Sequence, residues 1–139
     1  MANDTDIVIA GGGLNGTALA IALASGGFNV TLVDPTPEAT RKSATFDGRG
    51  YALALSSVRV LTALDLWSDI EGDAQPINHI RITHGSMSTG PSPFLLDFDK
   101  GEIEEGPMGQ MIEARHLRRD HLKAVNNTKA IASLKASLT

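Results

Sequence analysis

Residues 6–34, DIVIAGGGLNGTALAIALASGGFNVTLVD, decide the fold of this chain. A short β-branched run precedes three consecutive glycines, and the apolar stretch after them extends to Gly27, where a helix would end. A second apolar run, 30–33, then closes on Asp34. This order predicts a strand, a tight turn, a helix and a second buried strand, which together form a Rossmann-like βαβ unit.

Each part of this unit has a mechanical role in binding a dinucleotide. Gly11 permits the sharp turn off the strand, Gly13 lets the backbone approach a pyrophosphate, and Gly16 lets the helix pack closely on the sheet. The helix N-terminus offers the free N–H groups of Leu14 and Asn15 and the positive end of its dipole. The turn is therefore suited to hold phosphates.

Asp34 adds a second signal at the end of the second strand. It stands about twenty residues after the glycines, where the dinucleotide fingerprint has an acidic residue that accepts hydrogen bonds from ribose hydroxyls. Glycine-rich turns are common, so the glycines alone are weak evidence. The alternative is a βαβ unit whose glycines serve only the turn, and the strand, the helix stop and Asp34 together favour a dinucleotide site.

Length, charge and composition limit the functions that the chain could have. The chain has 139 residues, a formal net charge of -4 and no cysteine. The length fits one domain, and the negative charge argues against a nucleic-acid partner. The absence of cysteine excludes disulfides and thiolate chemistry and suits a reducing compartment. Asp4 and Asp6 precede the apolar run, whereas a secretory leader would begin with basic residues.

The stretch 35–50 is predicted to be an irregular loop on the cofactor side of the unit. Its two prolines end the strand, and its later glycines and polar residues are typical of a loop. Arg49 near its end would either clamp a pyrophosphate with its guanidinium or remain a solvated loop arginine. The position alone leaves both readings open.

The rest of the chain predicts one more helix-rich segment, a hairpin, and a strand followed by a helix. Trp67 is predicted to be a core residue. The predicted elements are a helix within 51–67 capped by Ser56 or Ser57, a turn over 72–76, strands over 77–84 and 94–98 joined by a loop over 85–93, a strand over 108–113, a helix over 114–125, and a tail over 129–139 without an assigned element.

No segment predicts a catalytic group of its own. The four histidines do not form a site, and the acidic residues of 97–105 favour a solvated hairpin tip over a cation site. The basic residues of 114–125 are typical of a solvated helix face. HExxH, GxSxG and P-loop motifs are absent from the sequence. Any reactive chemistry would therefore belong to a cofactor.

Four segments in order, 11–34, 47–56, 61–80 and 108–122, resemble a known family. The second carries an Asp-x-Arg and an Ala-Leu-Ser pattern, and the fourth a strand that ends in an acidic residue before an arginine-containing helix. Together they resemble the N-terminal portion of class A FAD-dependent aromatic monooxygenases, which share the para-hydroxybenzoate hydroxylase fold. The closest resemblance is to the ubiquinone-biosynthesis hydroxylases.

The resemblance implies a role for each matching residue. The fingerprint glycines would cradle the FAD pyrophosphate, Asp34 would bind the adenosine ribose, and Arg49 and Arg115 would contact the cofactor. In the family, NADPH reduces the FAD, and oxygen then hydroxylates a phenolic ring. The implied substrate is a phenolic or polyprenylated ubiquinone precursor. The implied location is cytoplasmic, peripheral to the inner membrane or within a ubiquinone-biosynthesis complex.

The resemblance covers only about the N-terminal third of a family enzyme. The Asp-Gly and Gly-Asp motifs, the remaining Rossmann strands and most of the substrate domain are not matched, and 77–113 would be the first strands of that domain. The expected architecture is α/β: a Rossmann-like FAD-binding βαβ unit with an added β-hairpin and helix, incomplete relative to the family fold, in one domain over 1–139.

Such a chain would be a fragment, a truncated gene product or one piece of a split enzyme. It would be inactive alone, marginally stable and a weak binder of FAD. Two alternatives stay open. One is an NAD-binding dehydrogenase module, which would need a following helix and a third parallel strand. The other is a non-catalytic remnant that keeps the fold and binds nothing.

Overall fold

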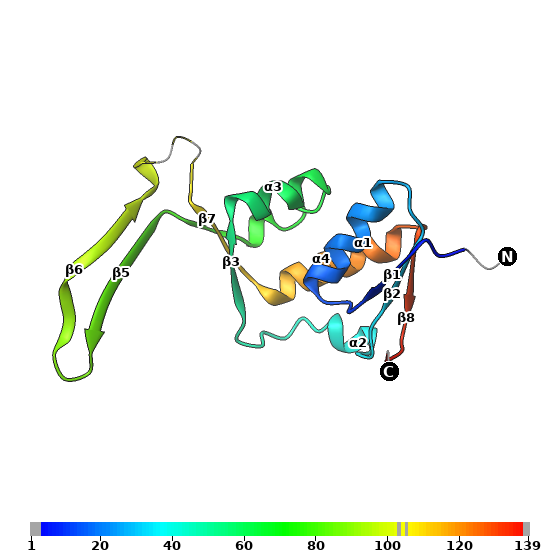
Figure 1. The fold of residues 1–139 in the computed structure, drawn as a ribbon, viewed down its shortest axis with the longest axis horizontal. Helices are drawn as coiled ribbons and strands as arrows, with labels where there is room; N and C mark the ends of the chain where they lie inside the picture. The colour runs from blue at the N-terminus through cyan, green and yellow to red at the C-terminus, as the bar shows by residue number, and fades with distance from the viewer. Residues whose placement is uncertain (1–3, 103, 105, 138–139) are drawn as a thin grey trace.

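The computed structural model describes residues 4–102, 104 and 106–137. Figure 1 shows the parallel sheet and two long helices at one end of the molecule and a hairpin at the other. The elements are β1 (Ile7–Ala10), α1 (Leu14–Ser25), β2 (Val30–Val33), α2 (Glu38–Arg41), β3 (Gly50–Ala54), α3 (Leu55–Ala63), the 3-10 turn η1 (Glu71–Asp73), β4 (Gln75–Ile77), β5 (His79–Ser86), β6 (Gly90–Asp99), the 3-10 turn η2 (Lys100–Glu102), β7 (Gly109–Glu113), α4 (Ala114–Asn127) and β8 (Ile131–Leu134).

The predicted βαβ unit is confirmed, and its sheet has three parallel strands in the order β1-β2-β8. Val30 of β2 pairs with Ile7 on one side and with Ile131 on the other. The expectation that the remaining Rossmann strands are absent was wrong for β8. This strand lies in the tail over 129–139, for which the sequence predicted neither helix nor strand. A short strand of this kind is recognisable only through its partner, because four residues carry little periodicity.

The core lies between this sheet and the helices. Val30 and Leu32 of β2 are each 1% exposed, and α1 packs against both β2 and α4. Each fully buried side chain of this size contributes about 1.5–3 kcal/mol to folding. Trp67 is 8% exposed and belongs to the same hydrophobic cluster, which confirms its prediction as a core residue.

A second sheet has the antiparallel order β3-β7-β4. Its central strand, β7, confirms the strand predicted over 108–113. The sequence predicted no strand at β3, and it predicted a turn where β4 begins. Residues of β3 form a strand because all five pair with β7, so tertiary pairing determines their conformation. As a result α3 starts at Leu55 with Ala54 as its N-cap, not at Ser56 or Ser57.

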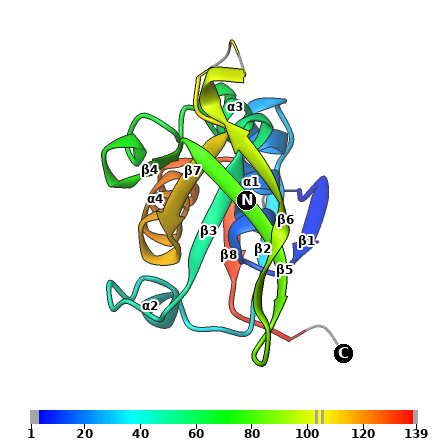
Figure 2. The ribbon, with the colours of Figure 1, turned by 90° about the vertical axis from the view of Figure 1, so that its left-hand side faces the viewer.

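The hairpin of β5 and β6 projects from the rest of the molecule (Figure 1), and Figure 2 shows it from that end, in front of the other elements. Its strands are longer than predicted, because the expected loop over 85–93 shrinks to a turn between Ser86 and Gly90. Gly90 adopts a φ of 72°, which favours glycine. Ile80 faces Phe98, and Ile82 faces Leu96 across the ladder. Since side chains alternate between faces, these four apolar residues share one face of the hairpin.

Helix α4 begins at Ala114 as predicted and continues two residues beyond the expected end, to Asn127. Its apolar residues, which include Leu117, Leu122 and Val125, are buried. The predicted loop over 35–50 contains one short helix, α2. Within the described residues, none of the helices is both long and apolar enough to cross a bilayer.

Candidate functional site

The glycine turn joins the ends of the first two strands. Gly11 has a φ of 108°, which only glycine adopts readily, and its N–H donates to the carbonyl oxygen of Val33 at 2.8 Å. A Cβ on Gly16 would collide with the carbonyl oxygen of Gly11. The helix can therefore begin directly against the turn only because position 16 lacks a side chain.

The N-terminus of α1 has the features of an anion site. Gly13 is the N-cap, and α1 has no side-chain cap bond there and no acidic residue in its first turn. The first intrahelical bond is from the N–H of Thr17 to the carbonyl oxygen of Gly13, at 2.9 Å. The preceding N–H groups, those of Leu14 and Asn15 among them, therefore point out of the helix end. A Cβ on Gly13 would have nothing within 4 Å, so space is open beside the backbone.

Asp34 is fixed to this turn by both carboxylate oxygens. Oδ2 accepts the N–H of Gly12 at 2.6 Å, and Oδ1 accepts the N–H of Thr36 at 2.7 Å. Burial opposes ionisation, but these two hydrogen bonds and the charge of Arg41 outweigh it and lower the pKa of Asp34. Each oxygen keeps a second lone pair, so the carboxylate can still accept hydroxyl donors.

The added strand β8 also supports Asp34. The backbone N–H of Asp34 donates to the carbonyl oxygen of Leu134 at 3.1 Å. The candidate ribose acceptor is thus held by the turn on one side and by β8 on the other.

A pocket of about 200 Å³ opens in front of this turn, and we call it the polar pocket because charged side chains line it. The predicted residues Gly13, Leu14, Asp34 and Arg49 line it together. The guanidinium-bearing residues Arg41 and Arg118 line it as well, and the sequence reasoning missed both. The three arginines outnumber the nearby carboxylates of Asp34 and Asp47, which leaves an excess of positive charge that suits a phosphate-containing ligand.

Asp47 holds two of these arginines in place. Its Oδ2 accepts Nη2 of Arg49 at 2.6 Å and Nη1 of Arg118 at 2.8 Å. The Arg49 guanidinium, followed by that of Arg118, holds the pKa of the Asp47 carboxyl well below its usual range. This contact docks the loop over 35–50 onto α4 and places both guanidinium groups at the pocket.

An apolar pocket of about 580 Å³ adjoins the polar one. Asn15 and Gly16 of α1 line it together with apolar side chains such as Leu53, Val60 and Leu61. The residues that line both pockets are Gly13, Leu14, Tyr51 and His121. The two pockets therefore meet at the N-terminus of α1.

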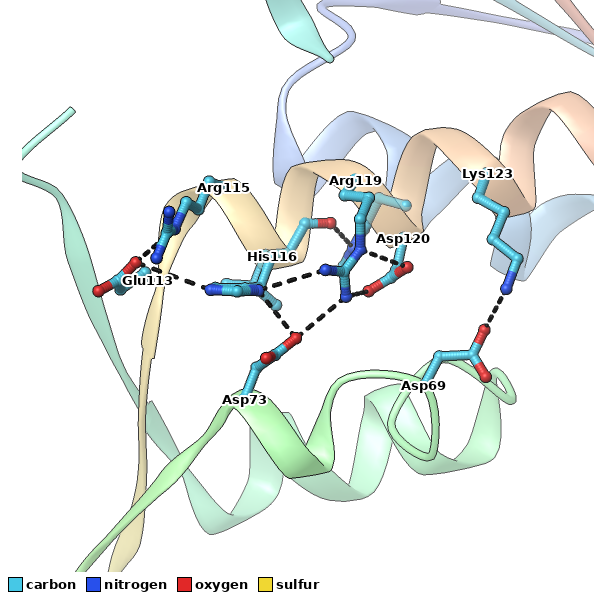
Figure 3. Close-up of polar contacts among 10 residues, drawn as sticks. Asp69, Asp73, Glu113, Arg115, His116, Arg119, Asp120 and Lys123 are labelled. Atoms are coloured by element: carbon cyan, nitrogen blue, oxygen red, sulfur yellow. Dashed lines mark hydrogen bonds and ion pairs between the residues drawn. The ribbon is translucent and has the colours of Figure 1, made fainter. Parts of the chain in front are cut away.

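Arg115 lies elsewhere, and its predicted cofactor contact stays a prediction. Figure 3 shows it beside Glu113, whose Oε2 is 2.6 Å from the Arg115 Nε. Its Nη1 also donates to the carbonyl oxygen of Ala44 at 3.4 Å. Arg115 is not among the residues that line the two pockets.

The other basic residues of α4 pair with acidic side chains rather than remaining simply solvated. Arg119 binds Asp73 at 3.0 Å, and Lys123 binds Asp69 at 2.7 Å (Figure 3). Exposed pairs of this kind contribute little to stability, because solvent screens them. Their arrangement ties α4 to the segment after α3 and leaves Arg118 as the arginine of this helix that reaches the pocket.

The described part of the chain contains no cluster of three or more side chains suited to hold a metal ion. His121 is buried and its Nδ1 lies 2.7 Å from the carbonyl oxygen of Leu117, within its own helix. The candidate site is thus formed by the glycine turn, Asp34 and the arginines that line the pocket.

Comparison with known proteins agrees with this geometry. The profile of a family described as FAD binding domain matches residues 4–134. Ubiquinone hydroxylase UbiL of Rhodospirillum rubrum is 38% identical over 129 residues, which are 93% of this chain and 29% of that protein. The chain thus spans less than a third of the length of this relative.

Solved structures show the same fold. PqsL of Pseudomonas aeruginosa, in complex with 2-aminobenzoylacetate, superimposes with a TM-score of 0.71 at 19% identity, over 95% of this chain and 33% of that one. The p-nitrophenol 4-monooxygenase PnpA of Pseudomonas putida superimposes with a TM-score of 0.68 at 16% identity, over 93% of this chain and 30% of that one.

Proposed function

The chain belongs to the FAD-binding domain family, and from this premise we propose that it is the FAD-binding portion of a flavin-dependent monooxygenase. The observation that carries the proposal is the meeting of the polar and apolar pockets at the N-terminus of α1. FAD is likewise built of a charged adenosine diphosphate half and a more apolar flavin half joined at the pyrophosphate.

The described residues fit the adenosine diphosphate half in detail. Asp34 would accept the adenosine ribose hydroxyls, and the N–H groups of Leu14 and Asn15 would donate to the pyrophosphate beside Gly13. Arg49, which also lines the pocket, would neutralise part of the phosphate charge. The apolar pocket would then receive the chain of atoms that leads to the flavin.

Bound FAD would supply the redox chemistry, because the described residues offer no nucleophile or acid–base pair of their own. What the chain contributes is binding and orientation. Arg115 would contact the cofactor only after leaving Glu113.

The similarity to a ubiquinone hydroxylase supports a more specific activity for the protein to which this portion belongs. We propose NADPH and oxygen as co-substrates and a phenolic, polyprenylated ubiquinone precursor as the ring that is hydroxylated. A substrate with such a tail favours a site peripheral to a membrane or within a biosynthetic complex.

We further propose that this chain alone binds FAD weakly and does not hydroxylate. Support comes from the small volume of the polar pocket, about 200 Å³, and from the apolar face of the hairpin, where Leu96 is 60% and Ile82 53% exposed. The alternatives are an NAD module and a remnant without a ligand. The third parallel strand β8 meets one requirement of an NAD module, whereas the loop over 35–50 and the β5/β6 hairpin that separate β8 from β2 argue against it. The family match adds to the preference for FAD.

Titration of the purified chain with FAD, FMN and NAD+ tests the proposal. FAD is expected to bind more tightly than FMN, which lacks the adenylate half, and more tightly than NAD+. Quenching of flavin fluorescence reports the first two ligands, and equilibrium dialysis reports NAD+. Tighter binding of NAD+ would favour the dehydrogenase module, and failure of all three ligands to bind would favour the remnant.

A pair of glycine variants makes the test specific to the site. A Cβ meets nothing within 4 Å at either Gly13 or Gly72, so neither change to alanine crowds the folded chain. Gly13 lines both pockets, whereas Gly72 lies in η1. Gly13→Ala is expected to weaken FAD binding at least about tenfold, equivalent to about 1.4 kcal/mol. Gly72→Ala should leave it unchanged.

A further inference from the structure

The side chain of Arg41 lies across the glycine turn. Its Nη1 donates to the carbonyl oxygen of Gly12 at 3.2 Å, and a Cβ on Gly12 would collide with the same guanidinium group. The middle glycine of the turn therefore makes room for Arg41. Arg41 comes from α2, within the loop for which the sequence predicted no element.

One N–H group of the Arg41 side chain has no acceptor among the described residues. The Nε of Arg41 is buried, and within the described part of the chain it has no hydrogen-bond partner. Buried N–H groups in folded proteins are nearly always paired, and an unpaired one is costly. Since the same side chain lines the polar pocket, a bound ligand is the natural source of the missing acceptor.

Arg41 and Asp34 offer complementary chemistry in that pocket. An ionised carboxylate only accepts hydrogen bonds, whereas a guanidinium only donates them. Each hydroxyl of a ribose does both. A vicinal diol bound to Asp34 through its O–H groups still needs donors for its oxygen lone pairs, and Arg41 is the cation that acts on Asp34 in this structure.

We propose that Arg41 completes a diol clamp with Asp34. When an adenosine nucleotide binds, Asp34 accepts the ribose hydroxyl protons, and the Arg41 guanidinium turns from the Gly12 carbonyl toward a ribose oxygen, which gives its Nε–H a partner. This inference rests on the proposed function and adds to it a residue outside the glycine fingerprint that selects a ribonucleotide over a deoxyribonucleotide.

The simpler role for Arg41 is to brace the turn by its bond to Gly12. A brace and a clamp give different results. If Arg41 only braces the turn, its loss would weaken the binding of every nucleotide by the same factor, because the turn contacts the phosphates of all of them. If Arg41 forms the clamp, its loss weakens the binding only of ligands that carry the clamped hydroxyl. The effects of removing the arginine and of removing the hydroxyl on the binding free energy are then coupled.

The test is a double-variant cycle between Arg41 and the ribose. ADP, 2′-deoxy-ADP and 3′-deoxy-ADP are titrated into the wild type and into Arg41→Gln, with backbone NMR shifts as the readout, since these follow millimolar dissociation constants. The matched control is Lys42→Gln, which removes one charge from the adjacent residue, whose partner is Glu38 at 2.6 Å.

The wild type is expected to bind ADP about tenfold more tightly than at least one deoxy analogue, equivalent to about 1.4 kcal/mol. Arg41→Gln should reduce this preference to less than about threefold, and Lys42→Gln should retain it. Equal weakening of all three ligands by Arg41→Gln, or no weakening, would overturn the clamp while leaving the proposed function intact. Failure of the wild type to bind ADP and FAD at all would overturn both.

A second readout needs no variant. The Nε–Hε resonance of Arg41 in the wild type should shift on addition of ADP and gain protection from solvent exchange. The deoxy analogue that lacks the clamped hydroxyl should leave it near its ligand-free position. An Nε–Hε signal that responds identically to all three nucleotides would contradict the proposal even if Arg41→Gln fails to fold.

Discussion

The backbone N–H of Gly12 donates a hydrogen bond of 2.6 Å to the carboxylate of Asp34. The acidic side chain at the end of β2 is therefore bound to the turn that follows β1. One contact thus serves both the stability of the βαβ unit and the shape of its candidate ribose site.

Asp34→Asn is expected to make the chain less stable at neutral pH, because the lowered pKa of Asp34 means that folding favours its charged form. This stabilisation is complete above the ordinary aspartate pKa of about 3.9 and is lost as the pH falls through the lower folded-state value. The melting temperatures of the two proteins should converge in acid. Asp65→Asn is the control, since its φ of 57° suits asparagine. A difference in melting temperature that persists in acid would contradict the stabilisation by ionised Asp34.

Gly16→Ala is expected to destabilise the chain by about 1–3 kcal/mol, because the added Cβ would collide with the carbonyl oxygen of Gly11. Helix propensity alone would favour alanine by about 1 kcal/mol, so the sign of the change identifies the collision. Urea denaturation measures the difference. Gly13→Ala, whose Cβ would have open space, should cost less, about 0.5–1 kcal/mol, because alanine is a poorer N-cap residue than glycine. Equal effects of the two variants would argue against close packing at Gly16.

His121 should make stability fall in mild acid. Burial lowers its pKa, and the Leu117 carbonyl and Asp120 only partly offset that effect. The unfolded state therefore binds a proton before the folded state does, so stability is complete above about pH 6.5 and declines as the pH falls below it. His121→Asn should flatten this decline in a series of urea titrations. His84→Asn, on the exposed hairpin, should leave the slope as it is.

Ile131→Ala should cost about 2–4 kcal/mol, since Ile131 is 9% exposed and its side chain belongs to the core cluster. Leu134, at the other end of β8, is 54% exposed, so Leu134→Ala should cost less than about 1 kcal/mol. Thermal unfolding monitored by circular dichroism compares the two. A similar loss at both positions would mean that β8 is held by its ladder rather than by the burial of Ile131.

Leu96→Lys should raise the solubility of the chain without lowering its melting temperature. Leu96 lies on the apolar face of a hairpin that projects away from the core, and exposed apolar strands associate with one another. Light scattering at increasing protein concentration measures the effect. Ser88→Lys adds the same charge at the hairpin turn and should change aggregation less. Unfolding caused by Leu96→Lys would show that this face is packed.

The parts of the fold that the sequence predicted are those whose partners are close in the chain. β1, α1 and β2 follow one another directly, and the glycine turn and Asp34 define the same unit twice. β3 and β8 were missed because each acquires its conformation from a distant partner, Gly50 from Glu113 and Ile131 from Val30. Periodicity within four or five residues carries no information about such pairing.

The residues of the candidate site also separate into those that the sequence predicted and those that it did not. Gly13 and Asp34 were predicted because the fingerprint specifies both residue type and spacing. Arg118 and Arg41 were missed because an arginine on a helix surface is indistinguishable in sequence from a solvated one. Only the docking of Asp47 onto Arg118, and of Arg41 onto the turn, selects these two from the remaining basic residues.

The position of β8 at the far side of β2 affects how the protein is made. During synthesis β1, α1 and β2 emerge first, but the second edge of β2 has no partner until residues 131–134 leave the ribosome. At ordinary elongation rates this interval is roughly 5–20 s. For that time the nascent sheet has two strands and an open edge, and Asp34 lacks its bond to Leu134. The ribose end of the pocket therefore forms after the glycine turn, and a chaperone would most benefit the chain while this edge of β2 has no partner.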